Sequence, residues 1–120
     1  MRHIALVLLA GLACSASQAQ MAPPGVKDMI VTGGLNAGKT HRVAEHCGAS
    51  ADTLKAYKAR FDADTKGGAE LYASLDVDIE KVFLQGRKDG DAFYDTVKSS
   101  PNRDTICSQT LALVKSQAGK

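Results

Sequence analysis

The stretch GGLNAGKT at residues 33–40 fits the phosphate-loop pattern G-x-x-x-x-G-K-[ST], with Gly33, Gly38, Lys39 and Thr40 at its fixed positions. In a nucleotide-binding protein such a loop lies in front of a parallel sheet, and an acidic residue at a strand end helps to hold magnesium. No segment after Thr40 alternates between apolar and polar residues as a strand would. We therefore interpret the match as a chance one at the start of a helix, with Lys39 and Thr40 in solvent. We expect no nucleotide or other cofactor.

Four residues with side chains that can bind metals follow within seven positions: His41, Glu45, His46 and Cys47. His41 and His46 are five residues apart, about 140° around a helix, so they point in different directions. A zinc-binding helix instead places its two histidines four residues apart. The absence of C-x-x-C-H also argues against covalent haem. We favour a polar helix face without a metal, and keep a metal or haem carrier using His41 and His46 as an alternative hypothesis.

Acidic residues form two groups. Asp76 and Glu80 are four apart and are expected to share a helix face, where they could act as the carboxylate pair of a small cell-wall hydrolase. The second group comprises Asp89, Asp91 and Asp95, and neither group fits a calcium-binding loop. We favour solvated helix faces and helix caps, because Asp and Glu are usually exposed, and keep the hydrolase as a second alternative.

The N-terminus has the three parts of a signal peptide in their usual order. Arg2 supplies a positive charge, residues 4–13 form an apolar run too short to span a bilayer, and small residues lead up to Ala19. This order predicts cleavage near Ala19 and export to the periplasm or the medium. Residues 1–19 are therefore expected to be absent from the mature chain.

Cysteine content supports the same interpretation. Cys14 is removed with the signal peptide, and Gly11 stands where lipoprotein signals usually have Leu, so no lipid anchor is expected. Cys47 and Cys107 remain, and in an exported protein two cysteines indicate a disulfide. Closing a loop of about 60 residues would stabilise the fold by about 4 kcal/mol.

Composition excludes other classes of function. The full chain has 15 basic and 13 acidic residues, with no block of like charge. Nothing in this distribution is typical of a nucleic-acid surface or a polybasic membrane patch. The sequence has no second long apolar run, so no transmembrane segment is expected. Removal of 19 of the 120 residues leaves 101, enough for one small domain.

The first half of the mature chain predicts an arm and two helices. Residues 20–34 contain two prolines and three glycines and are expected to form an extended arm. The first helix is expected from Asn36, with Gly48 as its stop, and the second begins with Ser50 as N-cap. The first helix is expected to carry Thr40, Val43, Ala44 and Cys47 on one face, and the second to carry Leu54, Tyr57 and Phe61 on one face.

The second half predicts two or three more helices. A long helix is expected over residues 69–88, interrupted by DGD at residues 89–91, after which Asp91 caps a short helix. Ser100 and Pro101 indicate the start of the last helix. The residues expected to face inward are Leu71, Leu75, Ile79, Val82, Phe83, Phe93, Tyr94, Val97, Ile106, Cys107, Thr110, Leu111 and Val114.

Together these patterns predict an all-α protein: a bundle of four to five helices in a single domain over residues 35–120, held by one disulfide. In architecture such a chain resembles small periplasmic chaperones, secretin pilots and toxin-neutralising proteins, although no motif carries the likeness. We expect a non-catalytic binding or accessory protein that acts through a protein partner in the periplasm. An exposed apolar groove would favour this function, whereas a pocket with two convergent polar groups would favour an enzyme.

Overall fold

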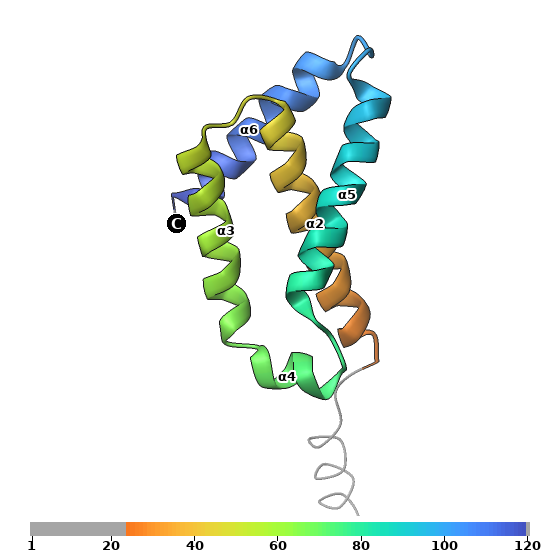
Figure 1. Cartoon of the computed structure of the whole chain (residues 1–120), viewed down its shortest axis with the longest axis vertical. Helices are drawn as coiled ribbons and strands as arrows, with labels where there is room; N and C mark the ends of the chain where they lie inside the picture. The colour runs from red at the N-terminus through yellow and green to blue at the C-terminus, as the bar shows by residue number, and fades with distance from the viewer. Residues whose placement is uncertain (1–23, 120) are drawn as a thin grey trace, which may run out of the picture.

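A computed structural model describes residues 24–119, which contain five α-helices and no strand. They are α2 (Val26–His46), α3 (Ala51–Lys66), α4 (Ala69–Ser74), α5 (Ile79–Val97) and α6 (Arg103–Ala118). Helices α2 and α5 lie side by side, α3 lies beside α6, and the short α4 connects the lower ends of α3 and α5 (Figure 1). The predicted all-α fold is confirmed.

The connection between α2 and α3 follows the expected signals. Gly48 has a left-handed φ of 93° and ends α2, a conformation that glycine adopts without steric cost. The Ser50 side chain accepts a hydrogen bond from the backbone N–H of Thr53 at 3.1 Å and thereby caps α3. Both predictions at this connection are confirmed.

The first helix begins earlier than the sequence suggested. Helix α2 starts at Val26, directly after Gly25 with its φ of 86°, so the expected extended arm is wrong for residues 26–34. Residues 20–23 of that arm, and the predicted signal peptide, lie outside the described residues. Glycines such as Gly33 and Gly34 are poor helix formers, but Gly34 is buried against Val82 of α5. Packing against another helix offsets the low helix propensity of glycine.

The helix break in this part of the chain comes at residues 75–78, earlier than the break predicted at residues 89–91. The long helix expected over residues 69–88 is interrupted after Ser74, and Asp76 in this connection has a φ of 57°. The side chain of Asp78 then accepts from the Lys81 N–H at 3.2 Å and caps α5. Leu71, expected to face inward, is 41% exposed on α4. The structure therefore places a turn where the apolar pattern looked continuous.

Helix α5 continues through DGD at residues 89–91, so Asp91 is not a helix cap. Gly90 is buried, and a Cβ atom there would lie 2.9 Å from the backbone oxygen of Lys39. The start of α6 is also displaced. Ser100 Oγ accepts from the N–H of Asn102 at 3.1 Å in a turn, and α6 begins at Arg103.

Helices α2 and α5 approach each other closely along paired glycines. A Cβ atom on Gly38 would lie 2.0 Å from the backbone oxygen of Phe83, and one on Gly86 would lie 2.2 Å from that of Leu35. Gly34 and Gly38 are four residues apart, as are Gly86 and Gly90, so each pair lies on one helix face. The absence of side chains lets the two backbones touch.

The core is small and lies where α2, α3 and α6 meet. Ala44, Leu54, Tyr57 and Val114 form one buried cluster, and Phe83 of α5 is 1% exposed. The predicted disulfide joins Cys47 to Cys107, with Cα atoms 5.3 Å apart, and links the end of α2 to α6. The bridge is consistent with an oxidising compartment. Within residues 24–119, no helix is both long enough and apolar enough to cross a membrane.

Candidate functional site

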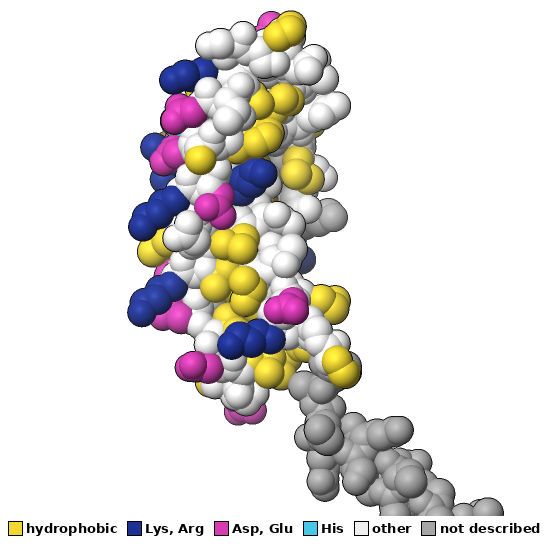
Figure 2. Space-filling view, turned by 90° about the vertical axis from the view of Figure 1, so that its right-hand side faces the viewer, with side chains coloured by type: hydrophobic (Ala, Val, Ile, Leu, Met, Phe, Trp, Pro, Cys, Tyr) yellow, Lys and Arg dark blue, Asp and Glu magenta, His cyan; other side chains and the backbone are white. Residues whose placement is uncertain are grey.

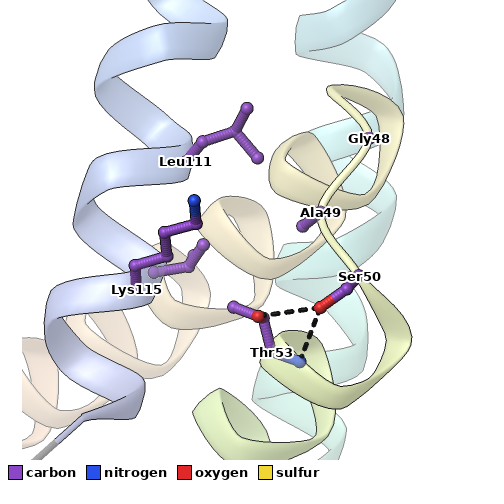
Figure 3. Close-up of a pocket in the computed structure, with 7 residues that line it drawn as sticks. Gly48, Ala49, Ser50, Thr53, Leu111 and Lys115 are labelled. Atoms are coloured by element: carbon purple, nitrogen blue, oxygen red, sulfur yellow. Dashed lines mark hydrogen bonds between the residues drawn. The ribbon is translucent and has the colours of Figure 1, made fainter.

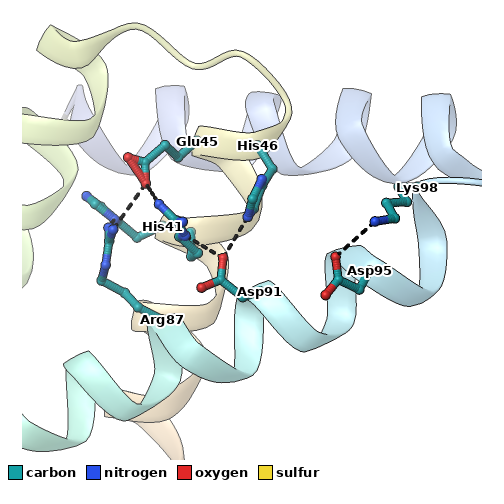
Figure 4. Close-up of polar contacts among 8 residues, drawn as sticks. His41, Glu45, His46, Arg87, Asp91, Asp95 and Lys98 are labelled. Carbon is teal, nitrogen blue, oxygen red and sulfur yellow. Dashed lines mark hydrogen bonds and ion pairs between the residues drawn. The ribbon is translucent and has the colours of Figure 1, made fainter.

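A cluster of six charged or polar side chains joins α2 to α5 (Figure 4). We call it the α2–α5 polar cluster; its members are His41, Arg42, Glu45, His46, Arg87 and Asp91. One helical turn separates His41 from Glu45 on α2 and Arg87 from Asp91 on α5. Because the glycine pairs bring the two helices together, these side chains reach each other across the interface.

Asp91 is the acceptor at one end of the cluster. Its Oδ1 atom accepts a hydrogen bond from Nε of Arg42 at 2.5 Å and lies 2.7 Å from Nε2 of His46. The His46 ring also stacks on Tyr94, with ring centroids 4.5 Å apart. The hydrogen bond with His46, followed by that with Arg42, lowers the pKa of Asp91. Asp91 is therefore held as a carboxylate.

Arg87 lies at the other end of the cluster. One of its terminal nitrogens is 2.5 Å from Nδ1 of His41, and the other donates to Glu45 at 3.1 Å. Glu45 also accepts from Arg42. Burial alone would raise the pKa of Glu45, but the bonds and charges of Arg42 and Arg87 outweigh it and lower that pKa.

The members of the cluster contact one another. Both carboxylates accept from arginines, so protonation of either would weaken an ion pair. His41 and His46 contact different residues, Arg87 and Asp91 respectively. Among residues 24–119 no group of three His, Cys, Asp or Glu side chains could hold a metal ion. The arrangement is a clamp that joins the two helices.

Sequence reasoning identified His41, Glu45 and His46 but missed Arg42, Arg87 and the role of Asp91. The one available signal was spacing. Arg87 and Asp91 are four apart, as are His41 and Glu45, and complementary charges at such spacing can meet across two helices. Without knowing that α2 and α5 are neighbours, this signal could not be used.

The phosphate-loop-like residues lie inside α2, where backbone N–H groups are used within the helix. Lys39 places its ammonium 4.3 Å from the centre of the Phe93 ring, and Thr40 hydrogen-bonds with the side chain of Tyr57. Both residues are half-buried, so the expectation that they point freely into solvent is wrong. Gly38 contacts the backbone of α5, whereas a Cβ on Gly33 would meet no atom within 4 Å.

The proposed carboxylate pair does not share a helix face. Asp76 lies in the connection between α4 and α5, and Glu80 lies in the first turn of α5. Glu80 forms an ion pair with Lys58 of α3 at 3.0 Å. The expected common face is wrong because the helix break comes at residues 75–78 instead of 89–91.

A cleft lies between the α2–α3 connection and α6 (Figure 3). Ser50 and Thr53 face Lys115 and Leu111 across it, and the two hydroxyls hydrogen-bond to each other at 2.8 Å. Lys115 is the one ionisable residue in its lining, so the cleft offers no acid–base pair.

Two adjoining clefts at the α4 end of the bundle, of about 290 and about 270 Å³, share Thr65, Tyr72 and Ile79. We call them together the apolar groove. Its acidic lining residues are already paired, Asp62 with Lys58 and Asp64 with Arg60. Met29 at its wall is 74% exposed. The apolar side chains that line the groove include Met29, Ile30, Phe61, Tyr72, Val77 and Ile79.

Apolar surface is not confined to this groove. On the face of the molecule that Figure 2 shows, hydrophobic side chains form a broken band along the length of the bundle, and charged side chains gather mainly along one edge. The most exposed large apolar residues in the described part of the chain are Met29, Leu71, Leu84 and Leu113.

Fold and site define the protein as a small all-α bundle with one disulfide, a clamp of ion pairs between α2 and α5, and an apolar groove at the α4 end. Comparisons of the chain with models of protein families, with curated proteins and with solved structures found no match.

Proposed function

We propose that this protein is an exported, non-catalytic accessory protein that binds a protein partner through the apolar groove. The observation that carries the proposal is the groove itself: an open concave surface whose wall includes Met29, Phe61 and Tyr72 and whose two acidic residues are paired with basic residues of α3. A surface of this kind favours the apolar face of another protein over a small polar substrate.

The shape of the groove supports a helical or extended segment as the bound element. Helices α2 and α3 form its two walls, while α4 and the start of α5 contribute Tyr72 and Ile79. Gly33 on the α2 wall carries no side chain and faces open space. A partner backbone could therefore approach α2 there, as α5 already does at Gly38.

Export to the periplasm or the medium is part of the proposal. It is supported by the signal-like residues 1–19 together with a disulfide between the remaining cysteines. The measurement is the intact mass of the protein recovered from the exported fraction. We expect a chain that begins near Gln20; a retained Met1, or a lipid on Cys14, would contradict this part of the proposal.

Partner binding is tested by capture from a periplasmic extract with variants that change only the groove. Gly33→Leu adds a bulky side chain to the α2 wall of the groove, at a position where a Cβ atom meets nothing within 4 Å, and Gly33→Ala is its matched control. Leu113→Ser is a second control, because it removes an exposed apolar side chain that does not line the groove. We expect the wild type, Gly33→Ala and Leu113→Ser to retain a partner that Gly33→Leu loses.

Two results would contradict the proposal. Equal capture by Gly33→Leu and wild type would show that the groove is not the binding surface. Absence of any specific capture, even with chemical cross-linking before extraction, would argue against a protein partner altogether.

A further inference from the structure

His41 lies where three helices meet. Its ring packs edge-on against Phe83 of α5, with centroids 5.4 Å apart, and lies 6.1 Å from Tyr57 of α3. Its Nδ1 atom is 2.5 Å from the guanidinium of Arg87. Arginine can only donate in this contact, so Nδ1 must accept, and the contact requires a neutral imidazole.

The charged groups around His41 come from each helix packed against it. Arg87 approaches from α5 and Lys58 from α3, and both oppose a positive imidazole; Glu45 on α2 favours one. The ring also hydrogen-bonds to the backbone of Leu54 on α3, and this bond favours the positive imidazole. Burial, followed by the charge of Arg87, lowers the pKa of His41 below its usual value of about 6.5.

His46, one turn and a half further along α2, has the opposite arrangement. Its partner is the carboxylate of Asp91, which Arg42 also contacts. A ring N–H of His46 can donate to this carboxylate, so the contact does not need an accepting ring nitrogen, whereas the contact of His41 with Arg87 does.

We propose that His41 is an acid-sensitive latch: protonation of its imidazole breaks the contact with Arg87 and opens the junction of α2, α3 and α5 around the ring, exposing the aromatic side chains there. This is a property of the free protein and does not depend on the partner proposed above.

Helix α3 is anchored by Leu54 and Tyr57 in the buried core, so the opening concerns the part of α3 that follows Tyr57. Its main helix contact is with α6, and its contact with α2 is small. Towards its C-terminal end it reaches α5 through Phe61 against Phe83, at 4.9 Å between ring centroids, and through the ion pair of Lys58 with Glu80. Arg87 released from His41 keeps its bond to Glu45, so α2 and α5 remain joined. The disulfide between Cys47 and Cys107 keeps α6 attached to the end of α2.

The direction of the pH effect follows from linkage. Unfolded or released His41 titrates near about 6.5, and the folded form binds its proton only at lower pH. The stabilising contribution of neutral His41 is therefore complete above about pH 6.5 and is lost as the pH falls through that value towards the folded pKa. Carboxylates titrate at about pH 4, so the stability that they contribute is lost only at lower pH.

The test uses the mature, oxidised chain between about pH 7.5 and about pH 5, a range that brackets histidine titration. His41 protonation and the contact of Phe61 with Phe83 are followed by NMR, and exposed apolar surface by the fluorescence of an apolar dye. His41→Asn places an amide oxygen where Nδ1 was and cannot gain a proton. His46→Gln is the control, because its amide nitrogen replaces Nε2 towards Asp91.

We expect dye fluorescence to rise severalfold in the wild type, in step with His41 protonation and with loss of the Phe61–Phe83 contact. The rise should be absent in His41→Asn and retained in His46→Gln. A rise that persists in His41→Asn would overturn the latch. If His41→Asn does not fold, the wild type decides: ring contacts and dye signal that stay constant while His41 titrates would refute the proposal.

Discussion

Replacing Gly38 by alanine places a methyl group where α5 leaves no room for one. The added Cβ atom would lie 2.0 Å from the backbone oxygen of Phe83 and 2.9 Å from the backbone nitrogen of Arg87. A carbon normally stays about 3.3 Å or more from a carbonyl oxygen. Because both obstacles are backbone atoms inside a helix, they cannot rotate away, and α2 and α5 must separate by about 1 Å.

The expected cost is the difference between two terms. Overpacking of a filled interface typically costs up to about 3 kcal/mol, and separation of the helices also disturbs Phe83, the most buried side chain of α5. The higher helix propensity of alanine offsets about 1 kcal/mol of this cost. Gly38→Ala should therefore lower the free energy of unfolding by about 2 kcal/mol, or Tm by roughly 8 to 16 °C for a domain of this size.

The same helix supplies the controls. A Cβ atom on Gly33 meets nothing within 4 Å, so Gly33→Ala should raise stability by up to about 1 kcal/mol through helix propensity alone. The stability of Gly34→Ala should lie between those of Gly33→Ala and Gly38→Ala. The nearest atom to its added Cβ, at 2.7 Å, belongs to the Val82 side chain, which can shift.

Thermal unfolding of the three variants and the wild type, followed by circular dichroism, measures this order. From highest to lowest Tm, the expected order is Gly33→Ala, wild type, Gly34→Ala and Gly38→Ala. A Gly38→Ala variant that melts at or above the wild-type temperature would refute the close approach of α2 and α5, and with it the geometry of the polar cluster.

Three further predictions follow from the disulfide, the charges and the helical position of residues 33–40. Cys107→Ser should lower the free energy of unfolding by about 2 to 5 kcal/mol, and reductant should change the melt of the wild type but not of the variant; equal melts of both oxidised proteins would refute this. The carboxylates of Asp91 and Glu45 have lowered pKa values, so the stability they contribute is present above about pH 4 and lost as the pH falls further. Urea unfolding should show a smaller acid loss for Asp91→Asn, and an unchanged loss would contradict the assignment. Calorimetry with ATP and magnesium should show no specific binding; a submillimolar affinity that Lys39→Ala abolishes would overturn this.

The helix caps and inward stripes near the disulfide were predictable from local sequence. Ser50 and Gly48 carry strong signals because their side-chain chemistry acts within a few residues. Cys47 and Cys107 were predictable as a pair because only two cysteines follow the signal-like segment. Val43, Ala44 and Val114 recur at helical spacing and are buried as expected.

The start of α2 and the path of α5 were not predictable by the same means. A glycine within a helical pattern reads as a break, since its intrinsic propensity is poor. Gly34 and Gly90 are helical because another helix lies against them, and that partner is distant in the sequence. The polar cluster was missed for the same reason, since its contacts between α2 and α5 join residues more than 40 positions apart.

One physical requirement explains both the sequence pattern that suggested a nucleotide site and the cluster that sequence reasoning missed. The pattern match at residues 33–40 depends on two glycines, and Gly38 is needed because the backbone of α5 touches α2 there. Contact at Gly38 brings the next turns of the two helices close enough for Arg42 to reach Asp91 and for Arg87 to reach His41 and Glu45. A change at Gly38 should therefore alter not only stability but also the titration of His41, because separation of the helices weakens the charge of Arg87 at the ring. If Gly38→Ala folds and leaves the His41 titration as in the wild type, then the helix crossing and the latch are independent features.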